Sequence, residues 1–142
     1  MASSRLDAAG LVKMKTLEEA LLLWQRLNSL VEQYALAVQR SQNSQTFLAT
    51  IRRTLPTLAE NLKMQFAMIA DIVVGLNLAS SRGASEGVRV RTLREGVAHI
   101  KQALEIAMLQ TKARHTIVEE KADELADNEG ATGDEDGAKS PS

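Results

Sequence analysis

Apolar residues recur every seven positions through the first half of this chain, and that repeat restricts the folds open to it. The repeat starts at Leu17 and produces two rows of side chains. The rows are Leu17, Trp24, Val31 and Val38, and Ala20, Leu27, Tyr34, Ser41, Leu48 and Leu55. Side chains spaced alternately by three and four residues lie along one face of an α-helix. The repeat therefore predicts a long amphipathic helix, and Thr16 with Glu19 forms a capping box at its expected start.

The end of this first helix has two interpretations. The repeat weakens over residues 39–46, which are polar but contain neither Gly nor Pro, and Pro56 offers a second break. In one interpretation, helices cover about 16–41 and 44–80, with a kink at Pro56. In the other, one helix runs to about residue 54 and the break falls at the proline. Both place consecutive helices antiparallel, because the connections are short.

The clearest turn in the chain lies at residues 80–85. Gly83 interrupts the apolar pattern there, and Ser85 can cap a following helix. That helix has its own apolar row with the same alternating spacing. The row contains Val90, Leu93, Val97, Ile100, Leu104, Ala107 and Thr111, and later Val118 and Leu125. A last helix is therefore expected to run to about residue 126. Residues 128–142 contain no apolar side chain larger than Ala and are expected to be disordered.

Length and composition favour a single helical domain. The 142 residues are 44% apolar but only 3% aromatic, and two are proline. A core made of aliphatic side chains with little turn punctuation suits helix packing. We expect an all-α, up-and-down bundle of about three long antiparallel amphipathic helices, completed into a larger bundle by oligomerisation, with a disordered acidic C-terminal tail. The bundle domain is expected at residues 16–127, after a frayed or short helical segment at residues 1–15.

The chain carries no mark of an oxidising compartment or of a membrane. It contains no cysteine, and the stretch from Met1 to Lys15 lacks the apolar centre of a secretory signal. The most apolar window, residues 64–79, is interrupted by Asp71 and Asn77 and is shorter than the roughly 20 residues that span a bilayer. These features predict a cytoplasmic protein without a membrane span.

Two segments have more apolar surface than one small bundle can cover. From Phe66 onward, apolar side chains point in nearly every direction around the helix axis. The four consecutive apolar residues from Leu21 to Trp24 likewise point to several sides of their helix. Large apolar patches usually mark interaction sites. We therefore expect a homo-oligomer, with a dimer as the first choice, or a bound protein partner. The candidate interface residues are Leu21, Leu22, Trp24, Phe66, Ile69, Ile72, Val73 and Leu76. In the alternative, Leu11, Val12 and Met14 fold back and cover this surface in a monomer.

Charge is distributed unevenly along the chain. Residues 1–118 hold 15 Lys and Arg against 9 Asp and Glu, whereas residues 119–142 hold 2 against 9. Six arginines are candidates for contact with an anion such as the phosphate backbone. These are Arg52, Arg53, Arg82, Arg89, Arg91 and Arg94. Nucleic-acid binding is the less favoured interpretation, because no aromatic residues for base stacking lie among the arginines.

No pattern in the sequence predicts catalysis. The chain has no cysteine nucleophile, no Gly-x-Ser-x-Gly elbow and no glycine-rich phosphate loop. Each histidine has a glutamate one helical turn away, His99 with Glu95 and His115 with Glu119, which predicts ion-paired helix surfaces rather than a metal site. We expect no cofactor and no metal. The predicted function is that of a non-enzymatic, oligomeric interaction protein, such as an adaptor, a scaffold or an accessory subunit; the alternative is a nucleic-acid-associated accessory subunit.

Overall fold

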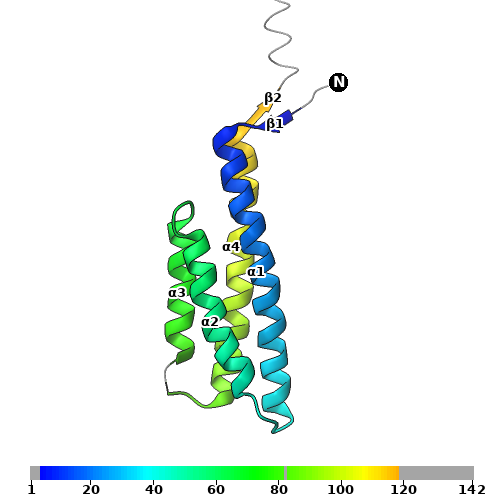
Figure 1. The fold of residues 1–142 in the computed structure, drawn as a ribbon, viewed down its shortest axis with the longest axis vertical. Coiled ribbons are helices and arrows are strands. Elements are labelled where there is room, and N and C mark those ends of the chain that lie inside the picture. Colours follow the sequence, from blue (N-terminus) through cyan, green and yellow to red (C-terminus); the bar gives the residue numbers. More distant parts are fainter. Residues whose placement is uncertain (1–3, 82, 119–142) are drawn as a thin grey trace, which may run out of the picture.

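The computed structural model describes residues 4–81 and 83–118, and within these ranges the chain forms a bundle of four helices with a short two-stranded ribbon at one end (Figure 1). The elements are β1 (Ser4–Leu6), α1 (Ala8–Gln39), α2 (Gln45–Leu62), α3 (Ala67–Ser81), α4 (Glu86–His115) and β2 (Thr116–Val118). The helices run alternately up and down. Each packs against its neighbours in the cycle α1, α2, α3, α4, so that α1 lies diagonally across the bundle from α3. The predicted helical bundle is confirmed, but it has four helices rather than three.

The first helix starts earlier than its capping box suggested. Asp7 caps α1, and its side chain accepts a hydrogen bond of 2.7 Å from the backbone N–H of Gly10. Thr16 lies inside the helix, where its hydroxyl donates to the carbonyl of Val12. The helix ends at Gln39 in the polar stretch, which confirms the interpretation that places the break at residues 39–46.

The second predicted helix is divided in two, and the division lies at residues 63–66 rather than at Pro56. The proline is inside α2 and exposed to solvent. The turn is held by a 2.7 Å hydrogen bond from the N–H of Phe66 to the carbonyl of Leu62. Sequence spacing concealed this turn, because the main row of buried positions is spaced by three and four residues on each side of it and by seven residues, two helical turns, across it. These positions are Leu48, Ile51, Leu55, Leu58, Leu62, Ile69, Val73, Leu76 and Ser80.

The last helix ends at His115, about eleven residues before its predicted end. Beyond it, β2 pairs antiparallel with β1, and the backbone N–H of Asp7 donates to the carbonyl of His115 at 2.8 Å. The start of α1 and the end of α4 are thus fastened together. The predicted disordered tail, residues 128–142, lies outside the described residues.

One continuous core runs through all four helices. The predicted rows supply it, including Leu17, Leu27 and Tyr34 from α1 and Leu93 and Ile100 from α4. α1 and α4 are about twice as long as α3, so their upper parts project beyond the turn between α2 and α3 (Figure 1). This step leaves part of α4 without a covering helix.

Candidate functional site

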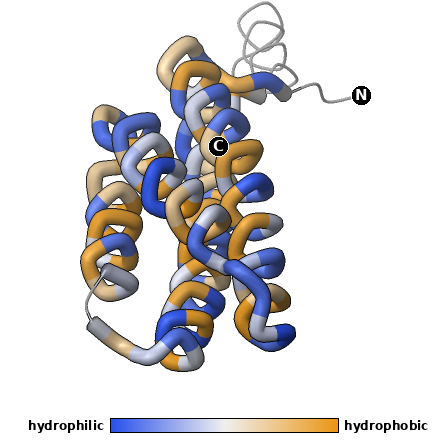
Figure 2. Tube along the Cα trace, turned by 60° about the horizontal axis from the view of Figure 1, so that its bottom comes forward, coloured by the Kyte–Doolittle hydropathy of each residue, from blue (hydrophilic) through white to orange (hydrophobic). Residues whose placement is uncertain are grey.

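The helix α3 is apolar on its outer side as well as on its core side (Figure 2). Its core side buries Ile69, Val73 and Leu76, as expected for a bundle helix. On the outer side, however, Met68 is 82% exposed and Leu78 is 59% exposed. Asp71 is the one charged residue of the helix. A soluble bundle helix would normally present polar residues there, so this side of α3 is a candidate contact surface.

A groove follows the line where α3 packs against α4. It consists of two adjoining hollows of about 320 and 460 Å³, and the side chain of Ile72 lines both of them. We call this feature the α3–α4 groove. Its wall on α3 is formed by Met68, Ile72, Gly75 and Ala79, and its wall on α4 includes Gly96, His99, Ala103 and Ile106. Both sets are spaced by three and four residues, the spacing with which helices receive a further helix.

The two ends of the α3–α4 groove carry different charges. Its upper end, beside the projecting parts of α1 and α4, is lined by Lys13 and Arg114. Its lower end is lined by Glu95 and Thr92. A basic end and an acidic end on one apolar groove make the surface complementary in charge to a copy of itself in the reverse direction.

The eight candidate interface residues fall into three groups in the structure. Trp24, Ile69, Val73 and Leu76 are buried in the chain's own core, and the indole N–H of Trp24 donates to the carbonyl of Val97 at 2.8 Å. Leu21, Phe66 and Ile72 are half-buried, and Leu22 is 66% exposed. Phe66, Ile69, Ile72 and Leu76 meet at the α3–α4 groove. Leu21 and Leu22 lie on α1, diagonally across the bundle from α3, and line neither hollow of the groove.

The wall that α4 contributes to the groove was not predicted from the sequence. Ala103 and Ile106 lie outside the core row of α4, beside the buried Leu104 and Ala107. Ile106 is 47% exposed. The only signal in the sequence is an apolar residue at a position where the helical pattern calls for a polar one.

The structure does not gather the six candidate arginines into one patch. Arg89 is held against the bundle, where its Nε donates to the carbonyl of Ser80 at 2.9 Å. Arg94 forms a bidentate ion pair with Glu32, with N–O distances of 2.8 and 3.0 Å, and this pairing lowers the pKa of the glutamate. The remaining described members are exposed but lie on diagonal helices, Arg52 and Arg53 on α2 and Arg91 on α4. Arg82 lies outside the described residues.

Among the described residues, His99 does not form the predicted ion pair with Glu95, and His115 lies against Asp7. His115 Nδ1 lies 3.1 Å from Oδ1 of Asp7, 108 positions earlier in the chain, and Glu119 is outside the described residues. His99 is exposed and lines the groove near Glu95. Among the described residues, no group of three or more His, Asp or Glu side chains could hold a metal ion. No described helix is both long and apolar enough to cross a membrane.

Comparison of the chain with protein-family models, with curated proteins and with solved structures found no match. The chemistry of the described surface is therefore the basis for assigning a function. On that surface, the α3–α4 groove is an open apolar feature whose walls have the residue spacing of a helix-binding site.

Proposed function

We propose that this chain is a non-enzymatic interaction protein that forms a homodimer through the α3–α4 groove and acts as an adaptor, a scaffold or an accessory subunit. The observation that carries the proposal is the exposed apolar side of α3, with Met68 and Leu78 beside an open groove. Burying one such side chain contributes about 1.5–3 kcal/mol. Association itself costs roughly 4–15 kcal/mol. Several side chains from each copy must therefore take part, which the groove supplies and the isolated Leu22 does not.

Twofold symmetry suits this surface. In a symmetric dimer, the same patch of both copies meets in reverse direction, so the basic end of one groove faces the acidic end of the other. Lys13 and Arg114 would then lie near Glu95 of the partner subunit. Glu95 and Arg114 are 19 positions apart on α4, roughly 28 Å along the helix. The midpoint between Glu95 and Arg114 falls beside Ala103, which lines the groove together with Ile72. The apolar centre of the groove would therefore lie on the twofold axis of the dimer.

Single glutamate substitutions at exposed positions test this proposal without emptying the core. We expect Met68→Glu and Ile106→Glu each to reduce the mass of the protein in light scattering from two chains to one, because a charge would be buried in the contact. The matched control is Leu22→Glu, an exposed leucine on the opposite side of the bundle, which should keep the mass of two chains. Circular dichroism checks that all three variants remain helical.

Two results would overturn the assignment of the interface. One is a mass of two chains for both groove variants, and the other is dissociation caused by Leu22→Glu alone. The second result would move the contact to the Leu21–Leu22 surface of α1.

The alternative function, a nucleic-acid-associated accessory subunit, would use the exposed Arg52, Arg53 and Arg91. Salt distinguishes it from the first proposal. Binding to a phosphate backbone weakens steeply as ionic strength rises, whereas apolar self-association changes little. Gel-shift titrations with single-stranded and duplex DNA at 50 and 200 mM salt would show a steep loss of binding if the alternative holds.

A further inference from the structure

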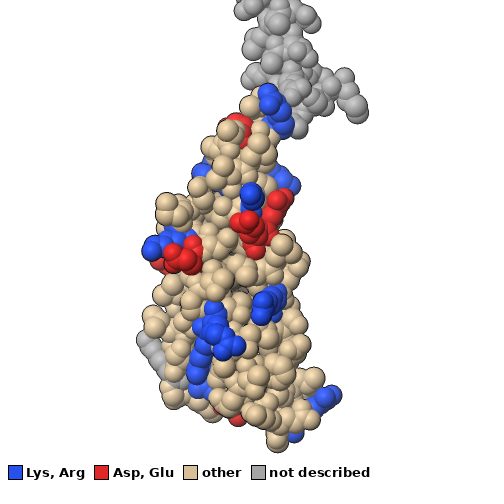
Figure 3. All heavy atoms as spheres, viewed as in Figure 1, with Lys and Arg blue, Asp and Glu red and all other residues tan. Residues whose placement is uncertain are grey.

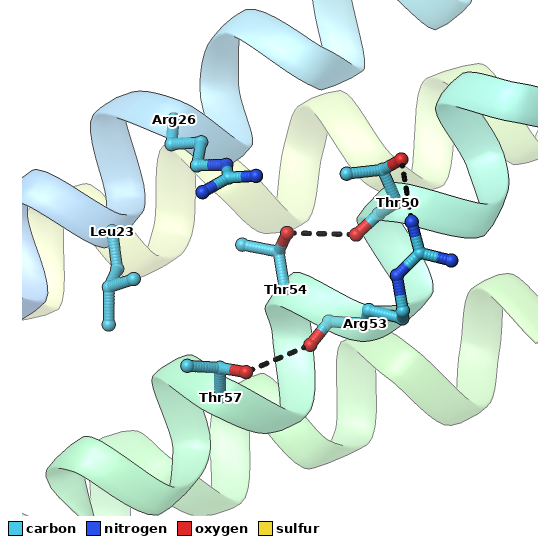
Figure 4. A pocket seen from close by; sticks show the side chains of 6 residues that line it. All are labelled: Leu23, Arg26, Thr50, Arg53, Thr54 and Thr57. Atoms are coloured by element: carbon cyan, nitrogen blue, oxygen red, sulfur yellow. Dashed lines mark hydrogen bonds between the residues drawn. The ribbon is translucent and has the colours of Figure 1, made fainter.

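A separate hollow of about 170 Å³ lies between α1 and α2, away from the α3–α4 groove (Figure 4). We call it the α1–α2 cleft. It is lined by Leu23, Arg26, Thr50, Arg53, Thr54 and Thr57. Arg26 reaches from α1 toward α2, and Arg53 extends along α2 toward Thr50, so that two arginines from different helices border the same small space (Figure 4).

The positive charge of the α1–α2 cleft has no nearby counter-charge. Neither Arg26 nor Arg53 has an Asp or Glu within four residues of it, so neither can form an ion pair along its own helix. Neither has a carboxylate partner within the described part of the chain. Glu60 is the single acidic residue of α2. Figure 3 shows the same arrangement on the surface, with basic side chains over the lower part of α1 and α2 and most acidic ones higher up.

The hydrogen bonds in the cleft leave the arginines as its free donors. Each threonine hydroxyl donates to a backbone carbonyl one turn earlier, at 3.1 Å for Thr50, 2.8 Å for Thr54 and 3.0 Å for Thr57. Arg53 Nη2 donates to Oγ1 of Thr50 at 3.2 Å, which holds this guanidinium beside Thr50 on α2 (Figure 4). The threonine protons are thus used within α2, and the remaining N–H groups of both arginines are available to a ligand.

We propose that the α1–α2 cleft binds a phosphoryl group. A guanidinium matches the oxygens of phosphate in a bidentate manner, and two guanidinium groups match the charge of about −2 that a phosphate monoester carries at neutral pH. A carboxylate would neutralise only one of them. The space corresponds to roughly five water molecules, which suits a group the size of phosphate. The site is independent of the dimer, because it lies on α1 and α2.

Titration of the full-length chain with phosphoserine, followed by amide NMR, tests this inference. We expect saturable shifts confined to the amides around Leu23–Arg26 and Thr50–Thr57, and no shifts with serine. Arg26→Gln and Arg53→Gln should each weaken binding roughly tenfold, because each removes charge-assisted hydrogen bonds. Arg91→Gln is the matched control. It removes the same charge from an exposed position on α4, and binding should stay within about twofold of the wild type, the change expected for a distant, screened charge.

Three results would overturn the phosphoryl site. These are an absence of saturable shifts in the cleft, a loss with Arg91→Gln as large as that with Arg53→Gln, and equally strong shifts with aspartate. Without saturable shifts, the cleft does not bind phosphoserine. An equal loss with Arg91→Gln would show that binding follows the overall charge of the protein. Equal shifts with aspartate would show that the cleft does not select phosphate over carboxylate. Met68→Glu, which addresses the dimer, should bind phosphoserine like the wild type, so the two proposals can fail separately.

Discussion

Asp7 joins the two ends of the described chain at the level of single side chains. Its carboxylate caps α1 at the N–H of Gly10 and also contacts the imidazole of His115. Gly10 has to be small, because a Cβ there would lie 2.5 Å from Cβ of His115. The sequence could predict a cap but not this partner, since the two residues are 108 positions apart and meet only when α1 packs on α4. Tertiary contacts of this kind leave no local pattern.

The pKa of Asp7 predicts how stability depends on pH. The hydrogen bond from Gly10 lowers this pKa most, and His115 and Lys13 lower it further. The folded state therefore favours the carboxylate, which stabilises the protein above the unfolded pKa of about 3.9. That stabilisation is lost as the pH falls through the folded pKa. In urea denaturation followed by circular dichroism, Asp7→Asn should lower the midpoint at pH 7, and the gap from wild type should narrow below about pH 4. An equal gap at both pH values would contradict this account.

At the scale of elements, spacing predicted which side chains are buried better than where the helices end. In the row from Leu17, the side chains through Val31 are buried as predicted and Val38 is half-buried. In the row of α4, the side chains from Leu93 to Thr111 are buried and Val90 is half-buried. The turn between α2 and α3 was missed because a continuous helix would bury the same face, and residues 63–66 contain no Gly or Pro. Only the packing of α3 back onto α2 distinguishes two helices joined by a turn from one continuous helix. The apolar excess of α3 is visible in the sequence. The packing that places α3 beside Ile106 of α4, and so forms the α3–α4 groove, is not.

Pro56 provides a test of how α2 is stabilised. A proline inside a helix has no N–H to donate to the carbonyl four residues earlier, here that of Arg52. Alanine in its place would restore this bond, and its higher helix propensity would raise the free energy of unfolding by about 3 kcal/mol. The greater conformational freedom of the unfolded chain would lower it by about 1 kcal/mol. Because Pro56 is exposed, its removal leaves no cavity. Urea denaturation should therefore show Pro56→Ala to be more stable by about 1–2 kcal/mol. Unchanged or reduced stability would mean that the proline is needed where α2 packs.

At the scale of the whole molecule, the two proposed sites lie on different sides of the bundle. The α3–α4 groove is on the side of α3, and the α1–α2 cleft involves the diagonal helix α1 (Figure 1). A symmetric dimer through the groove would therefore leave both copies of the cleft open to ligands. A dimer with two outward-facing anion sites would present a pair of such sites to one partner, which increases its effective affinity for a doubly phosphorylated one.

The mass of the chain in solution shows whether the α3–α4 groove joins two copies. Light scattering should be measured over a range of concentrations at 50 and 500 mM salt. We expect a mass of two chains that falls to one on dilution, with a midpoint concentration that salt changes little, because burial of apolar surface dominates the contact. A mass of one chain at every concentration and both salt levels would contradict the claim that the α3–α4 groove is a self-association surface.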